Sequence, residues 1–138
     1  QVANKIRLDI VTPEKVTYSA SVNMVIARTL SGDIGILPGH ASLIGALAVW
    51  PLRILTDDGE DQIAVAGGFI EVQPDKVTVL ANCAELAEEI DVERAETAKE
   101  RAERRLKESK EDHEMRLAEA ALHRALVRLQ VAKNKKPL

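Results

Sequence analysis

The sequence predicts an α+β protein with an N-terminal antiparallel β-sandwich and a C-terminal antiparallel hairpin of two helices. All seven glycines of the 138-residue chain lie at or before Gly68, where proline and β-branched residues are also frequent. Such a stretch needs a turn every few residues and favours short strands. From Ile90 onward the chain is rich in Ala, Glu, Lys, Arg and Leu, and its only proline is Pro137, so it favours helix. We expect one domain over residues 1–87 and the other over residues 88–138.

Short apolar and β-branched runs separated by turn signals predict the strands of the sandwich. The clearest hairpin signal is Asp57-Asp58-Gly59-Glu60, because Asp-Gly supports a positive φ without steric cost. The expected strands cover residues 6–10, 16–18, 22–30, 52–55, 63–66, 69–72 and 77–80, with a turn at residues 31–33. Many short strands with closely spaced turns are typical of an antiparallel sandwich or flattened barrel. Since the aromatic residues are only Tyr18, Trp50 and Phe69, we expect an aliphatic core.

Two glycine-containing stretches do not follow the alternation of an ordinary strand. The run from Gly35 to His40 is either an irregular crossover with a partly buried histidine or an exposed apolar loop that docks on a partner. The residues alone favour the crossover. The run Gly67-Gly68-Phe69 indicates a β-bulge or a close backbone approach. His40 has no Ser, Cys or carboxylate at a spacing typical of catalysis.

The helical half begins at Asp91, whose carboxylate is placed to accept hydrogen bonds from the free amides of the first turn. An apolar stripe follows, and we expect the helix to break in the polar segment from Glu108 to Glu114. A second stripe has the three-and-four spacing of a heptad seam. The stripes comprise Val92, Ala95, Ala98, Ala102 and Leu106, and then Met115, Ala118, Leu122, Ala125, Leu129 and Ala132. Two amphipathic helices with a short link predict a helical hairpin, and a link without Gly or Pro suggests that the hairpin opens.

Charge is distributed unevenly between the two halves. Residues 1–89 contain 6 Lys/Arg and 12 Asp/Glu, whereas residues 90–138 contain 13 and 10, which gives −6 and +3 within the total of −3. A basic tail on an acidic body favours contact with an acidic surface, on the body itself or on a partner. Arg124 and Arg128 lie one turn apart, either as a solvated cationic face or as a site for phosphates or an acidic loop. No nucleic acid partner is expected, because the basic run lacks aromatic residues for stacking.

Several function classes lack support in the sequence. It contains no P-loop, Gly-x-Ser-x-Gly, dinucleotide fingerprint or His/Cys metal cluster, so we expect neither a catalytic residue nor a metal site. The single cysteine, Cys83, allows no intramolecular disulfide and fits a reducing compartment. The longest apolar stretch, residues 43–55, is too short for a membrane span. Contact with a membrane is therefore expected only through other proteins.

Three segments together resemble the epsilon subunit of bacterial F-type ATP synthase. They are Ser31–His40 (SGDIGILPGH), Gly67–Val72 (GGFIEV) and Ile90–Ala95 (IDVERA), in the same order and spacing. The resemblance extends from about Ile6 to Ala132. The charged helix at residues 101–106 is most similar to versions from Bacillus-like organisms. The family implies the architecture predicted above and a non-catalytic function in the central stalk, which is part of the rotor.

The resemblance implies that the sandwich binds the gamma subunit and the ring of c subunits, at the cytoplasmic face of the bacterial plasma membrane. It therefore favours docking over an irregular crossover for the glycine-rich run, with Gly35, Leu37, Pro38 and His40 as contact residues. The C-terminal helices are implied to extend into the head of alpha and beta subunits and to inhibit ATP hydrolysis. The basic residues implied to meet the beta subunit are Arg104, Arg105, Arg116, Arg124 and Arg128.

In Bacillus-like members the compact hairpin binds ATP through a motif of the form Ile/Leu-Asp-x-x-Arg-Ala, which Ile90, Asp91, Arg94 and Ala95 match. By the same resemblance, the companion residues are Glu85, Arg101, Arg124 and Arg128. ATP would then be a regulatory ligand that shifts the hairpin toward the compact form, with the part of magnesium left open. The alternative for Asp91 and Arg94 is a helix cap and a packing salt bridge. The alternative for the whole chain is a free-standing ligand-sensing adaptor protein of the same architecture.

Overall fold

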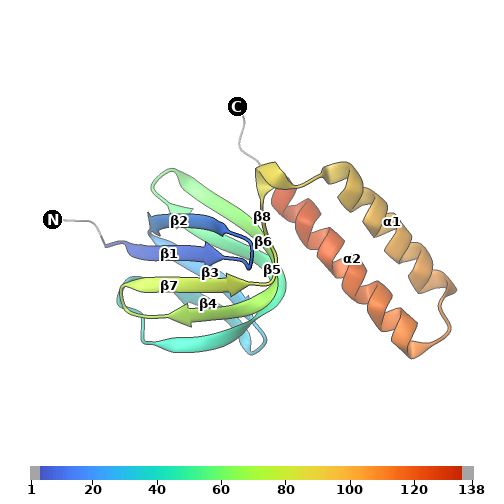
Figure 1. Cartoon of the computed structure of the whole chain (residues 1–138), viewed down its shortest axis with the longest axis horizontal. Coiled ribbons are helices and arrows are strands. Elements are labelled where there is room, and N and C mark those ends of the chain that lie inside the picture. The colour runs from blue at the N-terminus through green and yellow to red at the C-terminus, as the bar shows by residue number, and fades with distance from the viewer. Residues whose placement is uncertain (1–3, 135–138) are drawn as a thin grey trace.

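The computed structural model describes residues 4–134 and has the predicted α+β architecture, a β-sandwich followed by a two-helix hairpin (Figure 1). The extreme ends of both predicted domains, residues 1–3 and 135–138, lie outside the described part of the chain. The strands are β1 (Ile6–Val11), β2 (Val16–Val22), β3 (Met24–Thr29), β4 (Gly32–Ile36), β5 (Leu43–Thr56), β6 (Gly59–Val72), β7 (Lys76–Ala81) and β8 (Ala84–Leu86). A 3-10 turn, η1 (Ala87–Glu89), leads into α1 (Val92–Glu108) and α2 (Asp112–Ala132).

The strands form a single sheet that curves into two facing layers (Figure 1). Its order is β2-β1-β7-β6-β5-β3-β4, and β8 pairs with β6 beyond the end of β7. Neighbouring strands run antiparallel, as predicted, except β1 and β7, which are parallel. This pairing joins the first two strands of the chain to the rest of the sheet.

The interior of the sandwich is aliphatic, as the low aromatic content predicts. Its buried cluster consists of Ile, Leu, Val and Ala side chains. The largest fully buried side chains include Ile6, Leu8, Ile10, Ile36, Ile54, Ile63 and Ile70. Along β1, β3 and β7 buried residues alternate with more exposed ones, which is the period expected of strands with one face on a core. Burial of these side chains is the main force that holds the two layers together.

Several predicted strand boundaries were wrong. The expected strand over residues 22–30 is divided at Asn23, because Val22 ends β2 and the Asn23 amide donates instead to the carbonyl of Leu55 (2.8 Å). The turn expected at residues 31–33 lies one step earlier, where the Ser31 amide donates to the Thr29 hydroxyl (3.1 Å). Gly35 and Ile36 therefore belong to β4 rather than to an irregular loop.

β5 and β6 are each 14 residues long, much longer than the expected segments. Proline in mid-strand argues against a strand, because it has no amide to donate. Pro51 is nevertheless paired with Ala64 of β6, and the β3–β5 ladder on the other side is irregular between Ile26 and Thr29. The missing donor is therefore placed where the neighbouring ladder is already interrupted.

Gly67 and Gly68 mark a close backbone approach and not a bulge between β5 and β6. The register of these strands continues unchanged from Leu47 opposite Gly68 to Val49 opposite Ala66. Gly68 has a φ of +123°, and a Cβ atom at that position would lie 2.2 Å from the carbonyl oxygen of Leu80. Only glycine lets β6 pass so close to β7.

The helical hairpin begins at the predicted cap. The Asp91 carboxylate accepts a hydrogen bond from the Arg94 amide (3.1 Å), and α1 runs to Glu108. The break falls at residues 109–111, inside the expected polar segment, and α2 then returns antiparallel along α1 (Figure 1). The predicted stripes contribute the buried alanines Ala95, Ala102, Ala118 and Ala125, which let the helices approach closely. No helix within residues 4–134 is long and apolar enough to cross a membrane.

Replacing Gly68 by alanine tests the close approach of β6 to β7. Gly68→Ala combines a strained φ with a backbone clash, so we expect the free energy of unfolding to fall by about 3 kcal/mol or more. The matched control is Gly59→Ala, where φ is +129° but no atom lies within 4 Å of the added Cβ. That control should lose only about 1 kcal/mol. Urea unfolding measures both, and equal losses would refute the steric explanation.

Candidate functional site

The largest concentration of predicted site residues lies in a groove where the sandwich meets both helices. β8 and η1 form one wall, the first three turns of α1 form the second, and the end of α2 closes the groove. We call it the junction groove, and it has a volume of about 610 Å³. It is lined by Glu85, Glu89, Ile90, Asp91, Glu93, Arg94, Ala95, Thr97, Ala98, Arg101 and Arg128. Seven of the eight residues predicted for nucleotide binding are among them.

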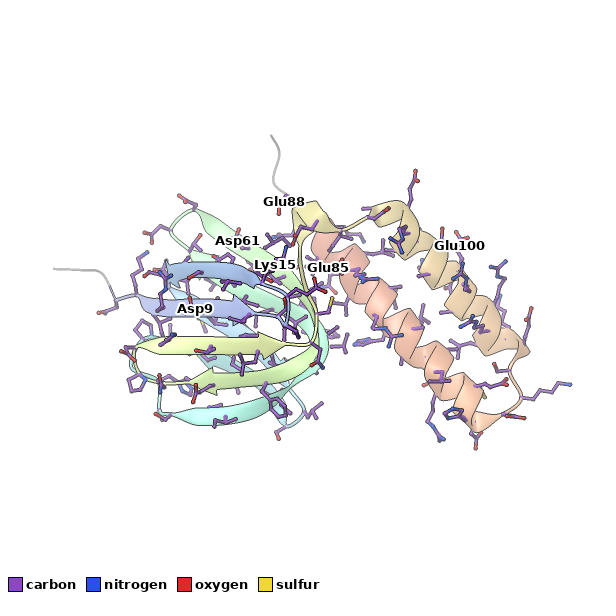
Figure 2. All side chains as sticks on the ribbon, viewed as in Figure 1. Asp9, Lys15, Asp61, Glu85, Glu88 and Glu100 are labelled. Atoms are coloured by element: carbon purple, nitrogen blue, oxygen red, sulfur yellow. The ribbon has the colours of Figure 1, made fainter. Side chains whose placement is uncertain are left out.

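Glu85 and Arg128 join the sandwich to α2 across the groove. The Arg128 Nε donates to the Glu85 Oε1 at 2.6 Å, and both side chains remain partly exposed. Figure 2 shows Glu85 at the junction between the sandwich and the hairpin. An ion pair of this exposure contributes about 1 kcal/mol or less, so it orients Arg128 more than it stabilises the fold.

Ile90 and Asp91 have clear structural functions in addition to lining the groove. Ile90 is buried in a small cluster with Ala64, Ala87, Val127 and Val131. Asp91 caps α1 through the Arg94 amide, so the cap interpretation of Asp91 is correct. Within the described chain the ion pairs include none that involves the Arg94 guanidinium. The packing salt bridge considered for Arg94 is therefore absent from this part of the chain.

Two carboxylates of the junction groove, Glu85 and Glu89, are paired with cationic side chains, and the partner of Glu89 lies outside the groove. Glu89 accepts a hydrogen bond from the Leu86 amide (2.9 Å) and pairs with Lys15 (3.2 Å). The hydrogen bond from the Leu86 amide, and to a lesser extent the contact with Lys15, lower the pKa of Glu89 below its ordinary value. Arg94 and Arg101 lie seven residues apart on α1 and so share one helix face. The groove therefore presents arginines from both helices beside carboxylates, of which Glu85 and Glu89 already have cationic partners.

Arg124 is the one predicted nucleotide residue that does not line the junction groove. It lies one turn before Arg128 and lines a small adjoining cavity of about 30 Å³ under α2. Glu85 and Arg128 border both spaces. Arg124 is thus next to the groove, on the side of the sandwich.

The loop predicted to contact partners extends from the end of β4. Gly35 and Leu37 are exposed, with Leu37 at 54%, whereas Pro38 and His40 are half-buried. The loop is held from behind, because the Gly39 amide donates to the Pro74 carbonyl (2.7 Å). It therefore has a partly buried histidine, as the crossover interpretation expects, and an exposed apolar tip, as docking expects.

The structure adds an apolar row that sequence reasoning missed. Register partners place five outward side chains side by side across β5, β6, β7, β1 and β2: Ala46, Phe69, Leu80, Val11 and Val16. We call this row the outer stripe. Phe69, Leu80 and Val16 are 57%, 55% and 62% exposed. The alternation does contain a signal, because Phe69 and Leu80 fall out of phase with the buried residues of their strands, but only the strand order aligns them.

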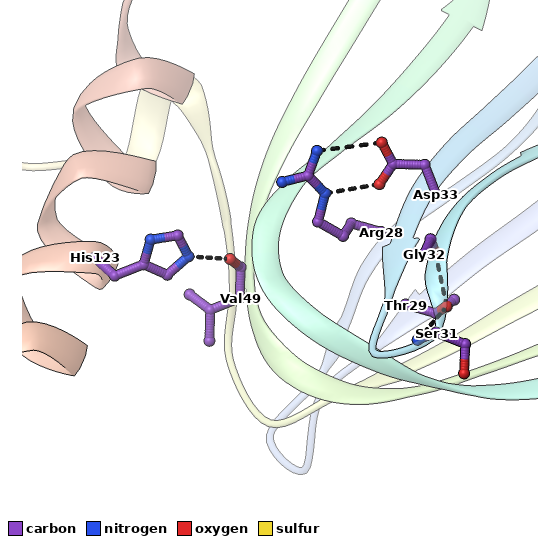
Figure 3. A network of polar contacts seen from close by, with 7 residues as sticks. All are labelled: Arg28, Thr29, Ser31, Gly32, Asp33, Val49 and His123. Atoms are coloured by element: carbon purple, nitrogen blue, oxygen red, sulfur yellow. Dashed lines mark hydrogen bonds and ion pairs between the residues drawn. The ribbon is translucent and has the colours of Figure 1, made fainter. Parts of the chain in front are cut away.

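α2 is attached to the sandwich by a second group of contacts that the sequence did not predict. The His123 Nε2 donates to the Val49 carbonyl at 2.6 Å, and its ring stacks on Trp50. The Trp50 indole also lies against the Arg28 guanidinium. Figure 3 shows His123 donating to the Val49 carbonyl, and this guanidinium donating to both oxygens of Asp33. Those hydrogen bonds lower the pKa of Asp33 below its ordinary value. His123, Val127 and Val131 follow at steps of four, a periodicity that identifies this second face of α2.

The remaining predicted partner residues are on the hairpin itself. Arg104, Arg105 and Arg116 are exposed, and Arg105 lines an open groove of about 480 Å³ near the turn between α1 and α2. This turn is the end of the hairpin that lies far from the sandwich (Figure 1). Among residues 4–134, no group of three or more His, Cys, Asp or Glu side chains is arranged to hold a metal ion.

Two family models cover nearly all of the chain. The model described as ATP synthase, Delta/Epsilon chain, beta-sandwich domain matches residues 5–87. The model described as ATP synthase, Delta/Epsilon chain, long alpha-helix domain matches residues 88–133. The chain belongs to the ATP synthase delta/epsilon family.

Relatives from Bacillus-like bacteria are similar over almost their whole length. The ATP synthase epsilon chain of Bacillus velezensis is 49% identical over 129 residues, which covers 94% of this chain and 98% of the relative. The epsilon chain of Desulforamulus reducens is 48% identical over 126 residues, with 91% and 96% covered. The predicted resemblance to epsilon subunits is confirmed. As an epsilon chain, it is a subunit of ATP synthase and not itself an enzyme.

Solved structures of ATP synthases contain chains of the same fold. A chain in the cryo-EM structure of the Euglena gracilis mitochondrial ATP synthase, showing OSCP, F1 and the c-ring, matches with a TM-score of 0.79 and 26% identity. That match covers 96% of this chain and 84% of the other. A chain from the Tetrahymena thermophila central stalk and c-ring matches with a TM-score of 0.58 at 15% identity, covering 96% and 99%. The second likeness shows the fold alone.

Proposed function

We propose that this epsilon chain is a rotor subunit of the central stalk that couples gamma to the c ring and restrains ATP hydrolysis through its C-terminal helices. It would act at the cytoplasmic face of the plasma membrane, attached only through the complex. The proposed regulatory function is supported mainly by the small apolar contact between the hairpin and the sandwich. Apart from polar contacts, α2 meets the sandwich through one small apolar cluster centred on Val127 and Val131, while α1 packs on α2.

Docking on the rotor is supported by two surfaces of the sandwich. The outer stripe offers apolar side chains on five neighbouring strands, three of them exposed, and grouped exposed apolar side chains mark protein contacts. The second surface is the loop at Leu37, whose exposed apolar side chain is held in place by the hydrogen bond from the Gly39 amide to Pro74. We assign the outer stripe to gamma, since it is the broader surface, and the loop to the c ring. The alpha and beta subunits would meet the hairpin.

Inhibition of hydrolysis is supported by the exposed arginines of the hairpin. In the structure α2 lies on the sandwich, and we call this arrangement the docked form. Arg104, Arg105 and Arg116 are free of the sandwich in the docked form, so they are available to an acidic segment of the beta subunit. Arg128 would join them only after α2 leaves the sandwich, because it is then released from Glu85. The two hairpin positions would thus differ in the number of cations they present to the head.

ATP binding in the junction groove is supported by the convergence of the predicted residues there. Arg94 and Arg101 from α1 and Arg128 from α2 border one space, so a polyphosphate bound between them would hold the helices together against β8. A ligand that requires both helices and the sandwich binds only the docked hairpin. It therefore shifts the equilibrium by its differential affinity for the docked and undocked forms.

Replacing Phe69 tests whether the outer stripe binds gamma. Phe69→Ser removes an exposed aromatic anchor, so we expect affinity for the gamma subunit to fall about 30-fold while stability changes little. The control is Leu117→Ser, which removes a similarly exposed apolar side chain (58%) from α2. Surface plasmon resonance with the full chain measures both. Unchanged affinity in Phe69→Ser would exclude the stripe from the interface.

Truncation tests the inhibitory function of the hairpin. We compare ATP hydrolysis by the cognate catalytic head assembled with the full chain or with a chain ending at Glu89. Faster hydrolysis with the shorter chain is expected, because the arginines that contact the head are then missing. Gel filtration controls for equal incorporation of the two chains. Equal hydrolysis rates with both chains bound would remove inhibition from residues 90–138.

Replacing the groove arginines tests the nucleotide site. Arg94→Ala and Arg101→Ala each remove a cation from the junction groove, and loss of a charge-assisted hydrogen bond to phosphate should weaken ATP binding roughly 10-fold or more. Arg105→Ala is the matched control, because it removes an arginine from the same helix outside the groove. Isothermal titration calorimetry of the full chain gives the dissociation constants. If the three variants bind ATP alike, the assignment of the groove is wrong.

A further inference from the structure

Besides its apolar cluster, α2 contacts the sandwich through His123, which lies outside the junction groove. The His123 ring reaches the sandwich at two points of β5. Its Nε2 donates to the Val49 carbonyl (2.6 Å), and its ring centroid lies 5.8 Å from that of Trp50 with an interplanar angle of 24°. Neither side chain lines the groove. The contact is therefore independent of the residues assigned to the nucleotide.

Within the sandwich, Trp50 is positioned by Arg28. The Arg28 guanidinium carbon lies 3.6 Å from the centre of the Trp50 ring. Arg28 is in turn fixed by Asp33, its register partner across β3 and β4, through hydrogen bonds of 2.7 and 3.1 Å. A guanidinium with both ends of its fork occupied has little freedom to turn. The indole therefore offers α2 a preformed stacking surface, whether or not the hairpin is docked.

We propose that His123 and Trp50 form a latch that sets the fraction of docked hairpin, with Arg28 and Asp33 as positioning residues for the indole. This inference rests on the proposed function only in that the hairpin moves. The stack and the hydrogen bond exist only when α2 lies on β5, so they stabilise the docked form and not the undocked one. A latch outside the groove changes the apparent affinity for a nucleotide solely through the docked fraction.

The latch predicts a specific response of the docking equilibrium. His123→Ala removes the stack and the hydrogen bond but keeps a strong helix former in α2, so the undocking constant should rise about 10-fold. Trp50→Leu should raise it by a similar amount. Combining the two changes should raise it by less than the product of the single effects, because both remove the same stack. His113→Ala, which removes an exposed histidine from the first turn of α2, is the control.

Methyl NMR of the full chain measures docking at the buried apolar cluster beside the latch. Ala64 and Ala87 are buried beneath Val127 and Val131, so their methyl signals report the docked fraction. A full chain carrying Val127→Asp and Val131→Asp gives the signals of the undocked form. We expect the His123→Ala and Trp50→Leu signals to move toward that reference, and those of His113→Ala to stay with the unchanged protein.

Three results would overturn the latch. They are methyl signals that do not move in His123→Ala or Trp50→Leu, equal movement in His113→Ala, and an unchanged protein whose signals already match the undocked reference. The readout involves no catalytic head and no nucleotide. If the substitutions shift docking as expected but the hairpin neither inhibits hydrolysis nor binds ATP, the proposed function is refuted and the latch is still supported.

Discussion

The position of the hairpin depends on the burial of Val127 and Val131 against Ala64, Ala87 and Ile90. These are small side chains, and their apolar area stabilises docking by a few kcal/mol at most. The β-sandwich, in contrast, has a large aliphatic core that does not involve the helices. Two bodies joined in this way can separate without unfolding either one. The weak attachment, rather than any flexible glycine, is what would allow the hairpin to take the second position proposed above.

Ile90 and Asp91 connect this attachment to the groove. Ile90 belongs to the buried cluster, and Asp91 fixes the first turn of α1. The motif predicted to bind a nucleotide therefore also caps α1 and packs against α2. Substitutions at either residue change docking and groove shape together. Arg94 and Arg101, which extend from α1 into the groove, separate the two effects more cleanly.

The sequence was informative where a local rule determines the structure. The change of composition at residues 90–95 separated strands from helices. Asp91 was correctly predicted to start α1, and the helix ended inside the predicted polar segment. The lengths of β5 and β6 were not predictable, because Pro51 and the glycine pair interrupt the alternation that defines a strand. Most of the residues that line the junction groove were predicted from the family resemblance and not from their spacing in the sequence. The contact of His123 with Trp50 joins positions far apart in the chain, and no local pattern says which strand a helix face will meet.

The parallel pairing of β1 with β7 has a consequence for assembly of the complex. It joins Val11 to Leu80, and contacts so distant in sequence form slowly because a long loop must close first. The outer stripe is continuous only once that pairing exists, since Val11 and Val16 enter it through β1. A chain that has not yet paired β1 with β7 therefore lacks the Val11 and Val16 part of this surface. Recognition of the stripe would then double as quality control, admitting only chains that have completed folding.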